Sequence, residues 1–228
     1  MAETAGPGAT RSAQRPDEVA LMVRVKICGI TNLEDALAAI DYGADALGFV
    51  FFKGSPRCVT VEQAGSIICK LPPFVTTVGV FVDETPETIH SSITDAGIDV
   101  IQLHGDEEPE ACQFSRRSIK AIRIKSIDSL EPLKTFRGVV SAFLLDAYTA
   151  DALGGTGQKF NWDIAVEAKQ FGRIILAGGL TADNIREAVL HVKPYGVDVS
   201  SGVEQEKRRK DHQKMKLFIE RAKGALSL

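Results

Sequence analysis

The sequence repeats a short unit, YGADA at residues 42–46 and AGIDV at residues 96–100. Each copy has the pattern of a helix end, a glycine in the position that follows a helix, and the start of a strand. PYGVD at residues 194–198 is a looser third copy. A helix–glycine–strand unit that recurs along a chain indicates alternating helices and strands, and therefore an α/β fold with a parallel sheet.

Apolar runs rich in β-branched residues alternate with helical patterns from residue 23 onward. Most of these runs are almost continuously apolar, which is typical of strands covered on both faces. The predicted strands are residues 23–30, 46–52, 76–82, 100–104, 120–125, 142–146, 173–177 and 196–200. Eight strands in roughly 200 residues predict an α/β fold with a single (β/α)8 TIM barrel of eight parallel strands. The main alternative is an open doubly wound sheet, which usually has fewer strands at this length.

Residues that favour helix starts precede several of the helical patterns. Thr60 with Gln63 resembles a capping box, and Pro86 after Thr85 suits a first helical turn. The other candidate caps are Asn32 and either Thr181 or Asp183. We expect the last helix at roughly residues 210–225, with the basic run 207–210 as its solvated start.

Composition restricts the class of protein. The chain has 228 residues and a net charge of −3, and no basic face points to nucleic acid. No apolar stretch reaches the roughly 18 residues of a membrane span. The four cysteines form no CxxC pair and accompany no secretory signal, so we expect a cytoplasmic protein without a metal site.

The first 21 residues differ from the rest of the chain. They are rich in Ala, Gly, Thr, Pro and Arg and lack periodicity, so we expect a disordered tail at residues 1–21. The barrel would then occupy residues 22–228. Met22 directly precedes the first strand, and a start codon assigned too far upstream would also explain the tail.

KICGIT at residues 26–31 places a cysteine and a glycine where an apolar strand turns toward a helix. In barrels of this kind chemistry collects at the carboxyl ends of the strands. Cys28 is therefore a candidate general base, and Lys26, two residues earlier, should point to the same side. The alternative is that Cys28 is a small core residue.

Asp146 ends the sixth predicted strand, after the apolar residues FLL. Its carboxyl group would face Cys28 across the mouth of the barrel, which makes it a candidate general acid. A thiol and a carboxyl group that face one small space can move two protons, as an isomerase requires. A capping aspartate at a strand exit is the alternative.

The loops after the last two strands predict a phosphate site. Such loops commonly bind phosphate through backbone N–H groups. Glycines allow a close approach and serine hydroxyls add donors, although turn formation alone could also explain the glycines. The candidate phosphate-binding residues are Gly178, Gly179, Ser200, Ser201 and Gly202.

Three other features lie near predicted strand ends. Arg57 follows two turn formers, and a rigid loop holding a guanidinium group suits a substrate carboxylate; a surface salt bridge is the alternative. LGGTG at residues 153–157 is a glycine loop long enough to close over a ligand. We interpret His104 as a residue of the mouth or wall rather than a catalytic one.

Eight stretches together resemble the phosphoribosylanthranilate isomerase family, in the family's order from residue 23 to about residue 217. KICGIT, GGTG..F.W and VDVSSGVE are the most specific. The stretches are KICGIT (26–31), GFVFF..SPR (48–57), VGVFV (78–82), QLHGDE (102–107), LLDA (144–147), GGTG..F.W (154–162), LAGGL (176–180) and VDVSSGVE (197–204).

This resemblance implies an Amadori rearrangement in tryptophan biosynthesis, with a small phosphorylated substrate and no cofactor or metal. The family's general base and general acid match Cys28 and Asp146, and its carboxylate-binding arginine matches Arg57. The glycines and serines named above match its phosphate loops. Either a monomer or a homodimer can be built on this barrel.

The resemblance is weakest after Glu204, where the family usually has a Pro-Gly turn before a Lys-Asp pair. Here QEKRR at residues 205–209 replaces that turn, which leaves the start of the last helix uncertain. One alternative function is a related phosphate-binding barrel, such as a histidine-pathway sugar isomerase with aspartate in place of Cys28. A catalytically silent binding barrel is another alternative.

Overall fold

A computed structural model describes residues 22–147 and 161–226. The expected disordered tail at residues 1–21 and the glycine loop at residues 153–157 both lie outside these ranges. Among the described residues, no helix combines the length and the apolar character needed to cross a membrane.

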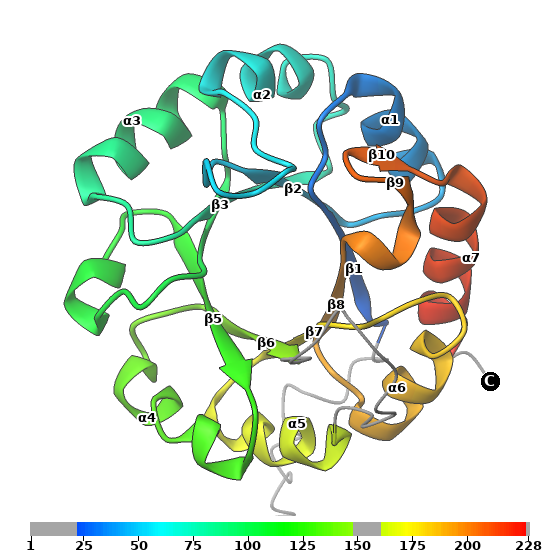
Figure 1. Cartoon of the computed structure of the whole chain (residues 1–228). Coiled ribbons are helices and arrows are strands. Elements are labelled where there is room, and N and C mark those ends of the chain that lie inside the picture. Colours follow the sequence, from blue (N-terminus) through cyan, green and yellow to red (C-terminus); the bar gives the residue numbers. More distant parts are fainter. Residues whose placement is uncertain (1–21, 148–160, 227–228) are drawn as a thin grey trace, which may run out of the picture.

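Eight parallel strands form a closed barrel, as the sequence predicted (Figure 1). The barrel closes because β1 pairs with β8, with Lys26 opposite Asp198 in the register. The alternative of an open doubly wound sheet is therefore wrong. The strands are β1 (Arg24–Cys28), β2 (Ala46–Val50), β3 (Thr76–Phe81), β4 (Val100–Leu103), β5 (Arg117–Ile124), β6 (Ala142–Ala147), β7 (Ile174–Ala177) and β8 (Gly196–Val199).

Helices surround the barrel on its outside (Figure 1). They are α1 (Leu33–Asp41), α2 (Val61–Ile68), α3 (Pro86–Ala96), α4 (Leu133–Phe136), α5 (Trp162–Ala168), α6 (Ile185–Val192) and α7 (His212–Lys223). Short 3-10 helices add to these, at Pro109–Cys112, Ile127–Leu130, Lys169–Phe171 and Ser201–Val203. The 3-10 helix Pro109–Cys112 is the helical element between β4 and β5.

Most of the predicted helix starts are confirmed. The side chains of Asn32, Thr60 and Thr85 each accept a hydrogen bond from a backbone N–H in the first turn of their helix. The prediction for α6 was wrong, because this helix begins after Asn184 rather than at Thr181 or Asp183. The Asn184 side chain accepts from the Thr181 N–H at 2.8 Å, which holds those residues in a turn before the helix.

The core has two parts, because alternate strand residues point outward and inward. Outward side chains pack against the helices and form the larger part, which includes Phe49, Leu103 and Phe218. Inward side chains fill the middle of the barrel, among them Val100, Ile119 and Leu144. At the carboxyl ends of the strands, polar side chains such as Gln102 and Asp198 stand beside a small buried cluster of Cys28, Val50 and Val80.

Some strand ends differ from the prediction. The first strand ends at Cys28 because Gly29 adopts a left-handed backbone conformation (φ 75°), which breaks the strand before residue 30. The fifth strand begins at Arg117, earlier than predicted. A short antiparallel hairpin, β9 (Glu204–Glu206) with β10 (Arg209–Lys210), was not predicted at all.

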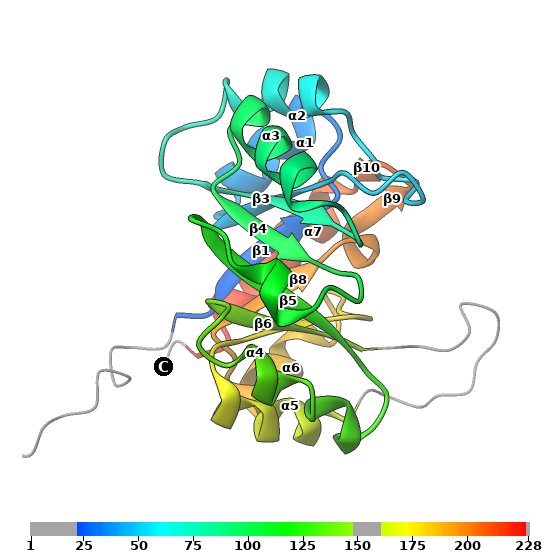
Figure 2. The same ribbon diagram turned by 90° about the vertical axis from the view of Figure 1, so that its left-hand side faces the viewer.

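This hairpin replaces the turn that the sequence left uncertain, and Figure 2 shows it beside one end of the barrel. Arg208 makes the turn in the left-handed region (φ 76°), and its backbone oxygen accepts from the Thr31 hydroxyl at 2.7 Å. Helix α7 then begins at His212, capped by the Asp211 side chain. The expected solvated start of the last helix is wrong for Lys210, which is buried.

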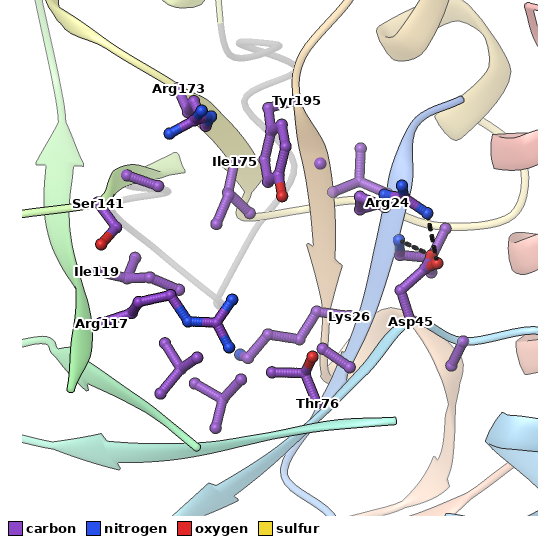
Figure 3. Close-up of a pocket in the computed structure, with 18 of the residues that line it drawn as sticks. Arg24, Lys26, Asp45, Thr76, Arg117, Ile119, Ser141, Arg173, Ile175 and Tyr195 are labelled. Carbon is purple, nitrogen blue, oxygen red and sulfur yellow. Dashed lines mark hydrogen bonds and ion pairs between the residues drawn. The ribbon is translucent and has the colours of Figure 1, made fainter. Parts of the chain in front are cut away.

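A cavity of about 650 Å³ opens at the end of the barrel where the strands begin (Figure 3). Arg24, Arg117 and Arg173 lie in its wall. Arg24 pairs with Asp45 at 3.3 Å, and the Arg173 guanidinium lies 5.8 Å from the centre of the Tyr195 ring. Helices of an α/β barrel end on this side, and their negative dipole ends account for arginines there.

Candidate active site

A second cavity, of about 550 Å³, lies at the carboxyl ends of the strands, where enzymes of this fold carry out their chemistry. Every strand, or the loop that follows it, contributes to its wall. The eight residues predicted from the sequence all line it: Cys28, Arg57, Asp146, Gly178, Gly179, Ser200, Ser201 and Gly202. The structure therefore brings all of them together in one space.

Cys28 is buried at the end of β1, beside a buried ion pair. The Lys26 ammonium donates to Asp198 Oδ1 at 2.9 Å, and both side chains are at most 10% exposed. Burial raises the pKa of the Cys28 thiol, and the Asp198 charge adds to this, while the positive charges of Lys26 and Lys210 oppose it. The thiolate that forms here is consequently a strong base.

The glycine opposite Cys28 in the register, Gly48 on β2, makes room for these groups. A Cβ atom at this position would lie 2.8 Å from Cys28 Sγ and 3.0 Å from Lys26 Nζ. Any side chain here would displace the thiol or the ammonium group. The glycine of the second strand is therefore part of what positions the candidate base.

Burial alone would lower the pKa of Lys26, but the charges of Asp198 and Cys28 outweigh it and leave the pKa raised. Lys26 is therefore cationic beneath the thiol. The sequence predicted that Lys26 and Cys28 point to the same side. The hydrogen bond between their side chains confirms it. Asp198 was missed, although its place in VDVSSG, two residues before Ser200, puts it on the inward face of β8.

Asp146 lies at the end of β6 with 35% of its side chain exposed, so its carboxylate can reach a ligand in the cavity. His104 Nε2 lies 3.3 Å from Asp146 Oδ2, and Gln102 Nε2 lies 3.1 Å from His104 Nδ1. The interpretation of His104 as a mouth or wall residue missed this contact. Its signals in the sequence are its position at a strand end and its place in QLHGDE (102–107).

Arg57 makes a two-point contact with Glu204, in which Nε and Nη2 each donate to a carboxylate oxygen at 2.6 Å. The salt bridge that the sequence offered as an alternative is therefore present. A guanidinium group has a second edge, formed by Nη1 and Nη2. Among the described residues Nη1 has no hydrogen-bond partner, so Arg57 keeps donors for an anion in the cavity.

Lys210, on strand β10, contacts three groups around Cys28 and Arg57. Its fully buried ammonium group donates to the backbone oxygens of Cys28 (2.7 Å) and Ser200 (3.1 Å) and to Glu204 Oε1 (3.2 Å). Burial lowers the pKa of Lys210, and the Glu204 charge opposes this. One side chain from the hairpin thus ties together the ends of β1 and β8 and the carboxylate that holds Arg57.

The loop after β7 is a tight turn. Gly178 (φ 76°) and Gly179 (φ 64°) both lie in the left-handed region, where L side chains are strained. The Asn184 side-chain amide donates to the Gly179 oxygen at 2.9 Å and ties the loop to the start of α6.

The loop after β8 packs directly on the loop after β7. A Cβ atom on Gly202 would lie 1.9 Å from the Leu180 oxygen, so only glycine fits. Ser201 begins a three-residue 3-10 helix that ends at Val203. The two loops therefore lie side by side in the wall of the cavity. In residues 22–147 and 161–226, no three His, Cys, Asp or Glu side chains gather as a metal site would require.

The comparison with known proteins agrees with this geometry. The family model described as N-(5'-phosphoribosyl)anthranilate (PRA) isomerase matches residues 25–221. The N-(5'-phosphoribosyl)anthranilate isomerase of Geobacter sulfurreducens is 60% identical over 204 residues, which are 89% of this chain and 100% of the relative.

Solved structures of the same family superpose on this barrel. One is a phosphoribosyl anthranilate isomerase in complex with reduced 1-(o-carboxyphenylamino)-1-deoxyribulose 5-phosphate, with 41% identity and a TM-score of 0.81. Another contains monomers generated from the dimeric enzyme of Thermotoga maritima, with 40% identity and a TM-score of 0.80. Each covers 89% of this chain and 100% of its own. The chain belongs to the N-(5'-phosphoribosyl)anthranilate isomerase family.

Proposed function

We propose that this isomerase converts N-(5-phosphoribosyl)anthranilate to 1-(2-carboxyphenylamino)-1-deoxyribulose 5-phosphate by an Amadori rearrangement in tryptophan biosynthesis. The observation that carries the proposal is the gathering of a thiol, a carboxyl group, a guanidinium group and two glycine–serine loops around one cavity. The substrate needs two proton-transfer groups, a carboxylate site and a phosphate site. Each need has its counterpart in that cavity.

The proton steps follow from the positions of Asp146 and Cys28. Asp146 gives its proton to the ribose ring oxygen as the bond from that oxygen to C1′ breaks, and the nitrogen lone pair forms a Schiff base. Cys28 then removes the proton from C2′, and the electrons of that bond form an enolamine. Addition of a proton to C1′ and loss of the proton from the C2′ hydroxyl then give the ketone, so two protons are added and two are lost and the substrate and product are isomers.

The substrate is held at two ends in this proposal. Its phosphate lies on the loops after β7 and β8, where Gly178 and Gly179 carry no side chain that would cover the backbone. Gly202 allows the two loops to pack together. Its carboxylate binds the edge of the Arg57 guanidinium group that Glu204 does not occupy. The contact with Glu204 orients Arg57 before the substrate arrives, which lowers the entropy lost on binding.

The assay for this proposal is the loss of anthranilate-type fluorescence when the purified chain is mixed with phosphoribosylanthranilate. We expect turnover, and rescue of a tryptophan auxotroph that lacks this step. A histidine-pathway aminoaldose phosphate is the control substrate for the alternative function. Turnover of the control substrate together with none of phosphoribosylanthranilate would contradict the proposal.

We propose a homodimer as the assembled state, in line with the dimeric relative from Thermotoga maritima. Phe74 is fully exposed and lies at the wall of the cavity shown in Figure 3, whose interior carries apolar side chains such as Val78 and Ile175. A second copy that packs there would remove this ring from water.

Replacing Phe74 with serine should therefore weaken the dimer by at least about tenfold in Kd, because burying an aromatic side chain contributes about 1.5–3 kcal/mol. Analytical ultracentrifugation of both proteins measures the change, with unchanged turnover as the sign of an intact barrel. The matched control is Ile127→Ser, which removes another exposed apolar side chain away from this cavity. A wild-type chain that sediments only as a monomer would contradict the proposed dimer.

We also propose a cytoplasmic location. All four thiols, Cys28, Cys58, Cys69 and Cys112, are free. A proposed catalytic base that must be a free thiol suits a reducing compartment, where thiols stay reduced.

A further inference from the structure

His104 bridges the proposed general acid and a buried amide. Its Nε2 lies 3.3 Å from Asp146 Oδ2, and its Nδ1 lies 3.1 Å from Gln102 Nε2. The His104 side chain is 23% exposed and Gln102 is buried. Asp146 lies on β6, His104 directly follows β4, and Gln102 lies on β4, so their order leads from the cavity into the barrel.

The amide nitrogen of Gln102 can only donate, so the Nδ1 atom that it contacts must carry a lone pair. A neutral imidazole with a lone pair on Nδ1 carries its proton on Nε2. That N–H then faces Asp146 Oδ2 and can donate to it. Gln102 therefore selects the tautomer of His104 that offers a donor to the acid.

This arrangement leaves one polar atom of Gln102 unpaired. Its Oε1 is buried and has no hydrogen-bond partner among the described residues. A buried acceptor without a hydrogen bond lowers the stability of the folded state. Turning the amide would place Oε1 against Nδ1, which would then need a proton. In a neutral imidazole this would leave a lone pair on Nε2 facing the Asp146 carboxylate, and only the doubly protonated ring would keep a donor there. The orientation in the structure leaves Oε1 unpaired and keeps an N–H of the neutral imidazole aimed at Asp146.

We propose that His104 is a positioning residue for the general acid and that Gln102 sets its tautomer. The imidazole N–H occupies Asp146 Oδ2, so the proton that Asp146 delivers sits on Oδ1, the oxygen left free for the substrate. The proposal rests on the proposed function of Asp146. It adds two residues that act through Asp146 without touching the reacting atoms.

Kinetics of two His104 variants test the positioning role. We expect His104→Leu to lower kcat by about 10- to 100-fold with KM within about threefold, because the acid is misplaced while substrate binding is kept. His104→Gln places an amide N–H close to the Nε2 position and should recover most of this loss. The matched control is His191→Leu, which breaks a His–Asp contact (2.7 Å to Asp163) on the outer helices and should leave kcat unchanged.

Nuclear magnetic resonance of the free, 15N-labelled enzyme tests the tautomer without substrate. We expect long-range 1H–15N spectra to show His104 protonated on Nε2 in the wild type, and protonated on Nδ1 in Gln102→Glu, whose carboxylate can only accept. A wild type protonated on Nδ1 would overturn the tautomer assignment, and wild-type kcat in His104→Leu would overturn the positioning role. A loss in His104→Leu that His104→Gln does not recover also counts against it, because it indicates packing.

The kinetic and spectroscopic experiments distinguish a failure of this proposal from a failure of the proposed function. If the wild type does not turn over phosphoribosylanthranilate, the proposed function fails, while the spectra still report the tautomer that Gln102 imposes. If the wild type turns over and the spectra or the variants disagree with the expectations above, only the role of His104 fails.

Discussion

Replacing Asp146 with asparagine should lower kcat by at least about 100-fold, the usual scale for a lost general acid. The amide keeps the size of the side chain and cannot supply the proton that opens the ribose ring. Cys28→Ser should cause a loss of similar size, since a hydroxyl group is a far weaker acid than a thiol and does not ionise to an alkoxide near neutral pH. Single-turnover fluorescence measures both, and it isolates the chemical step from product release.

Matched substitutions away from the cavity control for a general effect on the fold. Asp163→Asn changes an exposed aspartate on α5, and Cys69→Ser changes an exposed thiol at the end of α2, so both should keep wild-type kcat. Wild-type turnover in Asp146→Asn or in Cys28→Ser would remove that residue from the proposed mechanism. A double variant no slower than either single variant would agree with the two groups acting in one reaction sequence.

Glu204→Gln should lower the free energy of unfolding by about 3 kcal/mol, and Tm by about 6–12 °C in a chain of this size. The Glu204 carboxylate is 6% exposed and contacts both the Arg57 guanidinium and the fully buried Lys210 ammonium. Glutamine leaves these two cations without a counter-charge. Urea unfolding followed by circular dichroism measures the change, and Glu220→Gln on the exposed face of α7 is the control, expected within about 0.5 kcal/mol.

The pH dependence of the same variant has a definite sign. Burial alone would raise the pKa of Glu204, but hydrogen bonds from Arg57 and the charge of Lys210 outweigh it and hold the pKa below its usual range. The stabilisation is therefore complete above the pKa of the unfolded chain, about 4.3, and is lost as pH falls through the lowered pKa of the folded state. The difference in free energy of unfolding between the wild type and Glu204→Gln should become smaller in acid. A difference that becomes larger in acid would contradict the lowered pKa of Glu204.

The barrel was predictable because its signals are local. The glycines at residues 43 and 97 both take left-handed conformations at helix ends (φ 99° and 77°), as the repeated unit required. The hairpin of β9 and β10 was not predictable in this way. Its turn uses Arg208 where a glycine would be expected, and its stability comes from contacts such as Thr31 to Arg208, which are far apart in the sequence.

The candidate site also combines residues with local sequence signals and residues whose contacts are visible only in the fold. Cys28, Arg57 and Asp146 stand at strand exits or in the loops after them, and the order of the strands in a barrel brings such positions together. His104 stands at such an exit too, but its partner is visible only once β4 and β6 are placed around the same mouth. Glu204 and Lys210 lie in charged stretches that look solvated in sequence, and only the fold shows that they are buried.

The contacts that surround Cys28 also set the order in which the molecule can be completed. Lys26 meets Asp198 across 172 residues, and Lys210 meets the Cys28 oxygen across 182. Loop closure over such distances is slow, and chains are synthesised from the N-terminus. The first strand therefore waits, with its lysine unpaired, until almost the whole chain has emerged from the ribosome. The environment of the proposed base Cys28 is among the last parts of the protein to form, so an incomplete chain carries the thiol without the charged groups that surround it.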